Sequence, residues 1–257
     1  MSHIICEYSA GHVIKSYSPN LMVHPYLYSS RTVPKDEKVD TIFERIEGIL
    51  SRVHVIVVGP GLGRDELILK LTEKIIYRAK EMKMPIVIDA DGLYLIQQNV
   101  NIIKGYEHAI LTPNVVEFNR LEDAVGQKSE SNPDDACMHL ARNLGVVIVQ
   151  KGREDRISNG EETIKCDIEG TKKRVSGQGD TLSGTMSTFL AWKLAYQNKL
   201  WEHPDEFKDK ELMLLAAYGA CAVTRYAAQL TFKEKYRAMV TSDISSNIGS
   251  AYNTLFE

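Results

Sequence analysis

The stretch Ser176-Gly177-Gln178-Gly179-Asp180-Thr181-Leu182-Ser183-Gly184 places a carboxylate beside a glycine-rich turn. Apolar residues follow it at helical spacing, which predicts that residues 177–179 form the loop entering a helix. Unpaired backbone N–H groups and the positive end of the helix dipole gather at such a point, where they favour a bound phosphate. Glycine lets these amides approach an anion closely, and Asp180 is suited to taking a proton from a nucleophilic hydroxyl. The stretch therefore predicts phosphoryl chemistry.

The same short motif also fits an ordinary turn in which the aspartate caps a helix. Neither common nucleotide fingerprint decides between the two readings. The chain has no G-x-x-x-x-G-K-[ST] sequence, and Gly59-Pro60-Gly61-Leu62-Gly63 lacks the G-x-G-x-x-G spacing. A nucleotide site here must be of a third kind.

The bulk composition is typical of a soluble enzyme. The chain has 257 residues, 44% of them hydrophobic, which predicts one domain with a large core. Its net charge of −3 argues against a nucleic-acid or membrane partner. The four cysteines form no C-x-x-C pair and follow no secretory leader, which favours reduced thiols and a cytoplasmic location. Residues 212–228 form the most apolar run, which indicates a buried helix.

Apolar β-rich runs alternate with helical patterns along the chain, which predicts an α/β fold with a mostly parallel sheet. A hairpin is expected at 156–168, turning at Asn159-Gly160, with three helices after it. Polar residues 126–135 predict a surface loop, and the charged runs 35–38 and 203–210 predict solvated connections. The expected elements before the hairpin are strands at 53–58, 85–88, 109–111 and 146–149 and helices at 65–82, near 93 and at 115–124.

Several polar motifs follow the predicted strands, and ligands gather at the carboxyl ends of parallel strands. Asn114 and Glu117 would share one face of a helix, where their oxygens suit Mg²⁺, although an ordinary helix cap is the alternative. Lys151 and Gly152 would meet triphosphate oxygens, or form an exposed turn. At least one of Asp89 and Asp91 is expected to have a role in the turn at a strand end, and neither is expected to be catalytic.

Six motifs together resemble the ATP-dependent (S)-NAD(P)H-hydrate dehydratases, a branch of the ribokinase-like superfamily. They are Ile14-Lys15-Ser16-Tyr17-Ser18-Pro19, Val57 to Asp65, Ile88-Asp89-Ala90-Asp91-Gly92-Leu93, Leu111-Thr112-Pro113-Asn114 with Glu117-Phe118, Gln150-Lys151-Gly152, and residues 176–184. The resemblance covers nearly the whole chain. It implies a ribokinase-like three-layer α/β/α fold over residues 1–257, with ATP as co-substrate and Mg²⁺ as cofactor.

The resemblance also implies which residues bind the two nucleotides. Those for the hydrated dinucleotide are Gly61, Asn114, Val115, Val116, Glu117, Phe118, Asn119, Arg120 and Asp180. Those for ATP are Lys151, Gly152, Arg153, Glu154, Asp155, Gly170, Thr171, Lys172, Lys173, Arg174, Val175, Ser176, Gly177, Gln178 and Gly179. Some relatives reverse the charges of Arg153 and Glu154, and many have glycine in place of Ser176.

The implied reaction is repair. Hydration inactivates the nicotinamide ring of NADH or NADPH, and phosphorylation by ATP converts the hydroxyl into a good leaving group. We expect Asp180 to deprotonate that hydroxyl while the glycine amides and Mg²⁺ neutralise the phosphoryl charge. Two alternatives stay open: a ribokinase-like kinase for a vitamin precursor, and a non-catalytic nucleotide-binding form.

Relatives begin with a further strand, glycine-rich loop and helix, whereas Met1 to Cys6 aligns inside a later strand. We therefore expect this chain to lack that segment and to have an exposed or differently paired sheet edge, which favours oligomerisation. A mitochondrial location of a longer form stays open.

Overall fold

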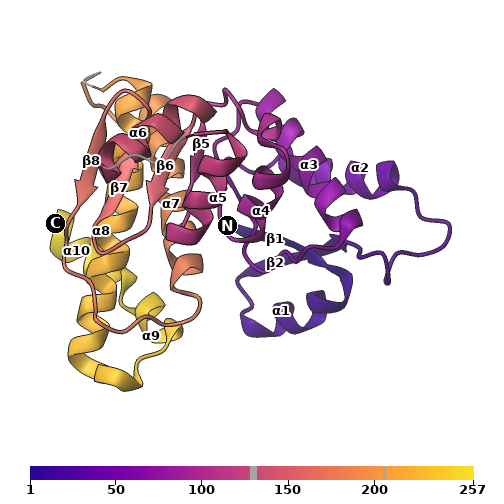
Figure 1. Cartoon of the computed structure of the whole chain (residues 1–257). Helices are drawn as coiled ribbons and strands as arrows, with labels where there is room; N and C mark the ends of the chain where they lie inside the picture. The colour runs from indigo at the N-terminus through magenta and orange to yellow at the C-terminus, as the bar shows by residue number, and fades with distance from the viewer. Residues whose placement is uncertain (128–131, 205–206) are drawn as a thin grey trace.

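A computed structural model describes residues 1–127, 132–204 and 207–257 (Figure 1). Its main feature is a six-stranded sheet in the order β3-β4-β5-β6-β7-β8. The strands are β3 (Ile56–Val58), β4 (Ile86–Ile88), β5 (Ala109–Leu111), β6 (Val147–Gln150), β7 (Asp155–Ser158) and β8 (Thr163–Cys166). The β3/β4, β4/β5 and β5/β6 pairs are parallel, and the β6/β7 and β7/β8 pairs are antiparallel. The predicted mostly parallel sheet is confirmed.

Helices cover both faces of this sheet, because alternate residues of each strand point to opposite sides. Ile88 and Leu111 pack on one side with residues of α3 (Glu66–Glu81), α4 (Asp91–Gln98), α5 (Val115–Ala124) and α6 (Pro133–Leu144). Val87 and Ile110 pack on the other side with α7 (Gln178–Gln197) and α8 (Asp209–Lys235). The result is the predicted three-layer α/β/α arrangement.

The first residues form a separate two-stranded sheet. β1 (Ser2–Glu7) pairs in parallel with β2 (Leu21–Leu27), and α1 (Gly11–Tyr17) connects them. Ile5 and Tyr28 of this unit pack against α2 (Val39–Leu50) and α3. Within the described residues, β3 is an end strand of the larger sheet, and its Ile56 packs in the same apolar cluster as Ile5. Figure 1 shows the unit of β1, α1 and β2 below α3 and α4.

The hairpin of β7 and β8 turns at Asn159-Gly160 as predicted, with Gly160 at a φ of 88°. Among the residues that the structure describes, four α-helices follow it instead of three, because Asn247 ends α9 (Thr241–Ser246) just before α10 (Ile248–Phe256) begins. The apolar run 212–228 lies inside α8 and is largely buried, as predicted. No described helix combines the length and apolarity that a membrane span requires.

The predicted loop at 126–135 is wrong at its end. Pro133 opens α6, and the Asn132 side chain caps the helix by accepting a hydrogen bond from the Asp134 amide. Proline is favoured in a first turn, where its missing N–H costs nothing. Residues 128–131 of that loop, and 205–206 of the predicted 203–210 connection, lie outside the described residues. Residues 209–210 of that connection already belong to α8.

Candidate functional site

The glycine-rich turn forms the amino-terminal end of α7. Gly177 is the N-cap residue, with a left-handed φ of 85° that favours glycine. The helix begins at Gln178, two residues earlier than predicted, so Gly179 lies in its first turn. No side chain caps this end of the helix. The Gln178 amide donates to the Val175 carbonyl oxygen at 3.4 Å, so the amides of Gly179 and Asp180 are the ones left to bind an anion.

Asp180 lies in the same first turn and is solvent-exposed. Partial desolvation raises the pKa of its carboxyl, and the nearby charge of Asp89 raises that pKa further, while Lys151 opposes the shift. A base with a raised pKa holds a proton more strongly, which suits general-base catalysis nearer neutral pH. Asp180, the expected base, is therefore adjacent in the structure to the glycine-rich residues 177–179 at the start of α7, which we call the anion cradle.

Asp89 joins this site, although the sequence analysis gave it no catalytic role. Its side chain is nearly fully buried, and Oδ1 accepts hydrogen bonds from Lys151 Nζ at 2.8 Å and from the Ala90 amide at 2.8 Å. Oδ2 accepts one from Ser183 Oγ at 2.8 Å. These bonds connect the ends of β4 and β6 to the first turns of α7. The available signal was an aspartate directly after an apolar strand, which is how Asp89 follows Ile88.

Gly179 faces this network. A Cβ atom built there would lie 3.5 Å from Asp89 Oδ2 and 3.7 Å from Lys151 Nζ. Both contacts are ordinary van der Waals distances, so Asp89 and Lys151 border the space in front of the helix end. Lys151 thus lies beside the start of α7, and its side chain is paired there with the buried carboxylate of Asp89.

The loop after β3 packs tightly against the loop after β4. A Cβ on Gly59 would lie 1.8 Å from the carbonyl oxygen of Asp89, and a Cβ on Gly92 would lie 2.6 Å from that of Val58. Glycine is required at both positions because backbone atoms occupy the space. Gly61 differs, since it has a φ of 64°, is exposed and would meet no atom within 4 Å. Its surface is open to a ligand.

Asn114 and Glu117 form a complete capping box at the start of α5. Asn114 Oδ1 accepts hydrogen bonds from the Val116 and Glu117 amides, and Glu117 Oε2 accepts one from the Asn114 amide at 2.8 Å. The cap anticipated as the alternative to metal binding is therefore present. Within the described residues, no group of three or more His, Cys, Asp or Glu side chains is arranged to hold a metal ion.

The segment 114–120 divides between surface and core. Val115 and Val116 are more than half exposed, and Asn119 and Arg120 are also exposed. Phe118 is only 2% exposed and packs in the core, so its side chain is turned away from any ligand. A substrate contact at Phe118 would have to come from its backbone.

Asp155 and Lys173, both among the predicted ATP residues, also have structural partners. The Asp155 carboxylate is buried, and its Oδ1 accepts a hydrogen bond from the Gly152 amide at 3.0 Å. Burial raises the pKa of Asp155, an effect that Arg225 opposes. Lys173 Nζ donates to the carbonyl oxygens of Met239, at 2.9 Å, and Arg237. These side chains hold the two loops in place, while Lys172 and Arg174 are exposed.

Residues of α9 in the carboxy-terminal segment contact the start of α7, and no sequence motif predicted these contacts. Thr241 Oγ1 donates a hydrogen bond to the Ser176 carbonyl, and a Cβ on Gly177 would lie 3.2 Å from Thr241 Cγ2. Ser245 Oγ lies 3.5 Å from Thr181 Oγ1. No local pattern marks these contacts, because more than sixty residues separate the partners in sequence.

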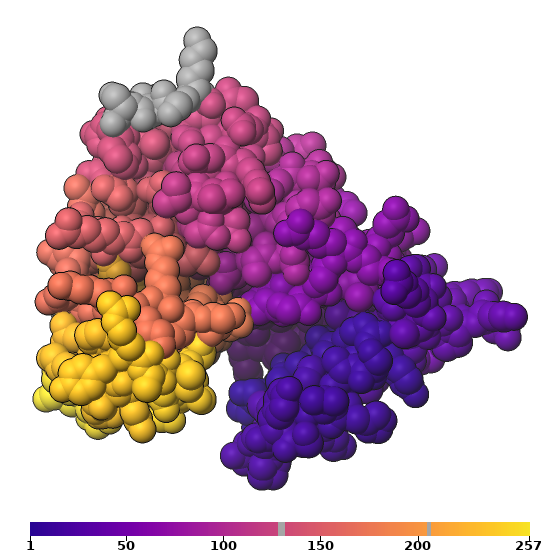
Figure 2. Space-filling model, turned by 60° about the horizontal axis from the view of Figure 1, so that its bottom comes forward, coloured from indigo at the N-terminus to yellow at the C-terminus, as the bar shows by residue number. Residues whose placement is uncertain are grey.

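Figure 2 views the molecule from the side that is lowest in Figure 1. The surface is hollowed between the indigo residues of the β1, α1 and β2 unit and the orange and yellow residues of the carboxy-terminal third.

Comparison with known proteins agrees with this geometry. The ATP-dependent (S)-NAD(P)H-hydrate dehydratase of Schizosaccharomyces pombe is 48% identical over 256 residues, covering 100% of this chain and 78% of the relative. A ribokinase-like superfamily protein of Enterococcus faecalis matches with a TM-score of 0.66 at 19% identity, over 99% of this chain and 77% of that one.

The ADP/ATP-dependent NAD(P)H-hydrate dehydratase of Bacillus subtilis, co-crystallised with ATP/Mg²⁺, matches with a TM-score of 0.61 at 16% identity. That match covers 98% of this chain and 78% of the bacterial one, and it shows the shared fold. The sequence profile described as NAD(P)H-hydrate dehydratase matches residues 1–250. With this fold, this cradle and these relatives, the chain belongs to the NAD(P)H-hydrate dehydratase family.

Proposed function

We propose that this protein catalyses the ATP-dependent dehydration of the S epimer of hydrated NADH or NADPH, releasing NAD(P)H, ADP and phosphate. The observation that carries the proposal is the placement of Asp180 beside the uncapped amino-terminal end of α7, with Lys151 at its border. The name of the Schizosaccharomyces pombe relative supports the choice of reaction.

Hydroxide is a poor leaving group, so the first step converts it into a phosphate ester. In this mechanism Asp180 takes the proton of the ring hydroxyl. The hydroxyl oxygen bonds to the γ-phosphorus of ATP as the bond from that phosphorus to ADP breaks. The ring then expels inorganic phosphate and loses a proton, which restores the double bond of the dihydronicotinamide. A kinase-like scaffold can thereby serve a lyase.

The cradle contributes electrostatic stabilisation to the phosphoryl transfer. In this proposal the amides of Gly179 and Asp180 face the position that the γ-phosphoryl group would take. Lys151 adds a positive charge that reaches the same space. The segments 151–155 and 170–179 bind ATP in this proposal. Hydrogen bonds of Asp155 and Lys173 fix them in place.

The residues fit a magnesium ion that is bound mainly through the nucleotide. Mg²⁺ usually retains several waters and takes one or two protein carboxylates in addition to substrate phosphates. Asn114 Oδ1 already accepts two amide hydrogen bonds, so Glu117, whose Oε2 caps the helix, would offer its other oxygen. When bound, the ion would neutralise charge on the triphosphate.

The test is to incubate the protein with hydrated NADH, ATP and Mg²⁺ and to follow the absorbance of reduced nicotinamide. We expect NADH, ADP and inorganic phosphate to appear in equal amounts. A small-molecule kinase would instead retain the phosphoryl group on an organic product. ATP binding without ATP consumption would identify a non-catalytic form.

A further inference from the structure

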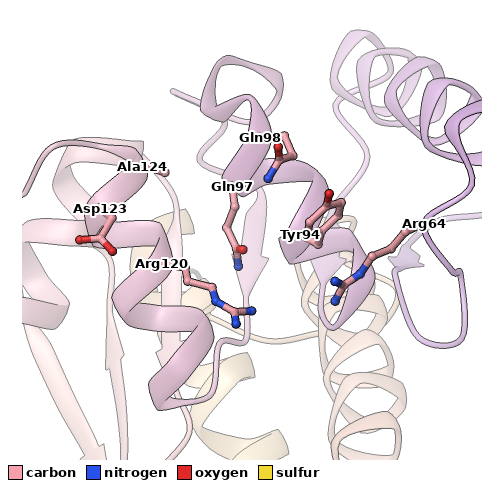
Figure 3. Close-up of a pocket in the computed structure, with 7 residues that line it drawn as sticks. All are labelled: Arg64, Tyr94, Gln97, Gln98, Arg120, Asp123 and Ala124. Atoms are coloured by element: carbon pink, nitrogen blue, oxygen red, sulfur yellow. The ribbon is translucent and has the colours of Figure 1, made fainter.

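A second concave region lies between α4 and α5, outside the cradle of α7 (Figure 3). It has a volume of about 540 Å³ and opens to solvent. This volume is within the usual range for small-molecule sites. Its lining is polar and includes Arg64, Tyr94, Gln97, Gln98, Arg120 and Asp123.

Arg64 is held in a fixed orientation. Its Nε donates a hydrogen bond to Asp91 Oδ1 at 2.9 Å, and its guanidinium carbon lies 4.3 Å from the centre of the Tyr94 ring. The pairing engages Nε and leaves both terminal amino groups available. Figure 3 shows them directed into the space between the two helices. A guanidinium fixed in this way is preorganised for a phosphate.

Arg120 approaches the same space from α5. Figure 3 shows its guanidinium pointing toward α4, opposite Arg64. The residue is exposed, and no ion pair of Arg120 is found among the residues that the structure describes. Gln97 also points inward and adds an amide that can donate and accept hydrogen bonds. Asp91 and Asp123 balance much of the positive charge, so recognition here depends on directed N–H donors more than on a positive field.

The pocket shares Arg120 with the proposed substrate site. Arg64 follows the open Gly61 by three residues, and the Gly63 amide donates to Asp91 Oδ2 at 3.0 Å. Asp91 itself is two residues beyond Asp89, the partner of Lys151. On the other side, Arg120 lies on the helix that begins at Asn114. A dinucleotide that contacts residues 114–120 would therefore also meet this pocket at Arg120.

We propose that this pocket binds the adenosine end of the hydrated dinucleotide, with a phosphate group between Arg64 and Arg120. The inference rests on the proposed function and specifies how the far part of its substrate is recognised. Tyr94 and Gln97 provide contacts for the ribose or base. The phosphate is either the 2′-phosphate that distinguishes NADPH or the diphosphate common to both dinucleotides.

The test measures binding of two fragments, ADP-ribose and 2′-phospho-ADP-ribose, by isothermal titration calorimetry. A non-hydrolysable ATP analogue is kept saturating so that the fragments cannot occupy the ATP cradle. The variants are Arg64→Ala and Arg120→Ala, with Arg64→Lys and Arg120→Lys retaining charge without the planar fork. Arg45→Ala is the matched control, because Arg45 is also an exposed arginine in an ion pair, with Glu37 at 2.9 Å.

We expect each alanine variant to weaken fragment binding roughly tenfold, the lysine variants to lose less, and the control to match the wild type. A loss confined to 2′-phospho-ADP-ribose would place the 2′-phosphate between the arginines. An equal loss for both fragments would place the diphosphate there. Unchanged affinity in both alanine variants, or no binding of either fragment by the wild type, would overturn the proposal.

A dehydration assay on the same variants separates this inference from the proposed function. We expect KM for the hydrate to rise while the rate at saturation changes little, because the pocket lies away from Asp180. Arginine-dependent fragment binding in a protein without dehydratase activity would leave the pocket assignment standing and reject the reaction. Dehydratase activity with a KM for the hydrate that neither substitution changes would support the reaction and reject the pocket assignment.

Discussion

Lys151 Nζ donates a 2.8 Å hydrogen bond to Oδ1 of Asp89, which is 2% exposed. The two residues are 62 positions apart in sequence and follow different strands of the parallel sheet. Their pairing borders the space in front of Gly179 and places a negative charge near Asp180. The catalytic carboxylate of this proposal is therefore tuned by a second, buried one.

Asp180→Asn should abolish most turnover while leaving ATP binding intact. The amide retains the size of the side chain but cannot accept the hydroxyl proton, a contribution that is typically worth about 10²–10⁴-fold in rate. The measurement is the recovery of NADH absorbance from the hydrate, with ATP binding followed by calorimetry. Near-normal turnover in this variant would remove Asp180 from the base role.

Asp89→Asn should move the acid limb of the pH–rate profile to lower pH. Burial and the Asp89 charge both raise the pKa of Asp180, so activity is lost as pH falls through that raised pKa. Removing the charge lowers the pKa, and the base then stays ionised in more acidic solution. The profile of kcat/KM checks this, and an unmoved acid limb would contradict it. Stability should also fall, by about 1–3 kcal/mol, because the Lys151 hydrogen bond is weakened.

Ser183→Ala is the matched variant for that test. It removes the 2.8 Å hydrogen bond to Asp89 Oδ2 without changing any charge. We expect a stability loss of about 0.5–1.5 kcal/mol, measured by urea denaturation, and a smaller displacement of the acid limb. If both variants moved the profile equally, loss of packing would explain the effect better than loss of charge.

Gly59→Ala should destabilise the fold more than Gly61→Ala. Both glycines have positive φ, at 122° and 64°, but only at Gly59 would the added Cβ meet backbone, 1.8 Å from the Asp89 carbonyl. We expect a loss of about 1–2 kcal/mol from backbone strain at Gly61. Overpacking should add about 1–3 kcal/mol or more at Gly59. Chemical denaturation compares the two, and equal losses would refute the proposed contact between the loops.

Thr241→Val should weaken ATP binding with little change in turnover at saturating ATP. Valine keeps the shape that packs against Gly177 but cannot donate to the Ser176 carbonyl. The lost hydrogen bond is worth about 0.5–1.5 kcal/mol, which should appear as a higher KM for ATP. A lower kcat with unchanged KM would argue that Thr241 acts on the chemical step.

The local elements of this protein were largely predictable. The strands at 86–88 and 109–111 and the helix at 115–124 agree with the expected ranges within a residue, because short apolar runs and helical periodicity are local properties. The strand that became β3 was expected from residue 53, and the structure begins it at Ile56. The predicted number of helices after the hairpin was wrong, because the break between α9 and α10 is the single residue Asn247, which hardly changes the helical periodicity.

Sequence by itself determined the parallel α/β layout, the glycine-rich start of α7 and the aspartate in its first turn, because each depends on neighbouring residues. Only the tertiary structure decided that Asp89 and Ser183 join Lys151 beside Asp180, that Asp155 and Phe118 turn inward, and that Thr241 braces Gly177. Those relationships depend on how strand ends and distant helices meet in space, which no local pattern encodes.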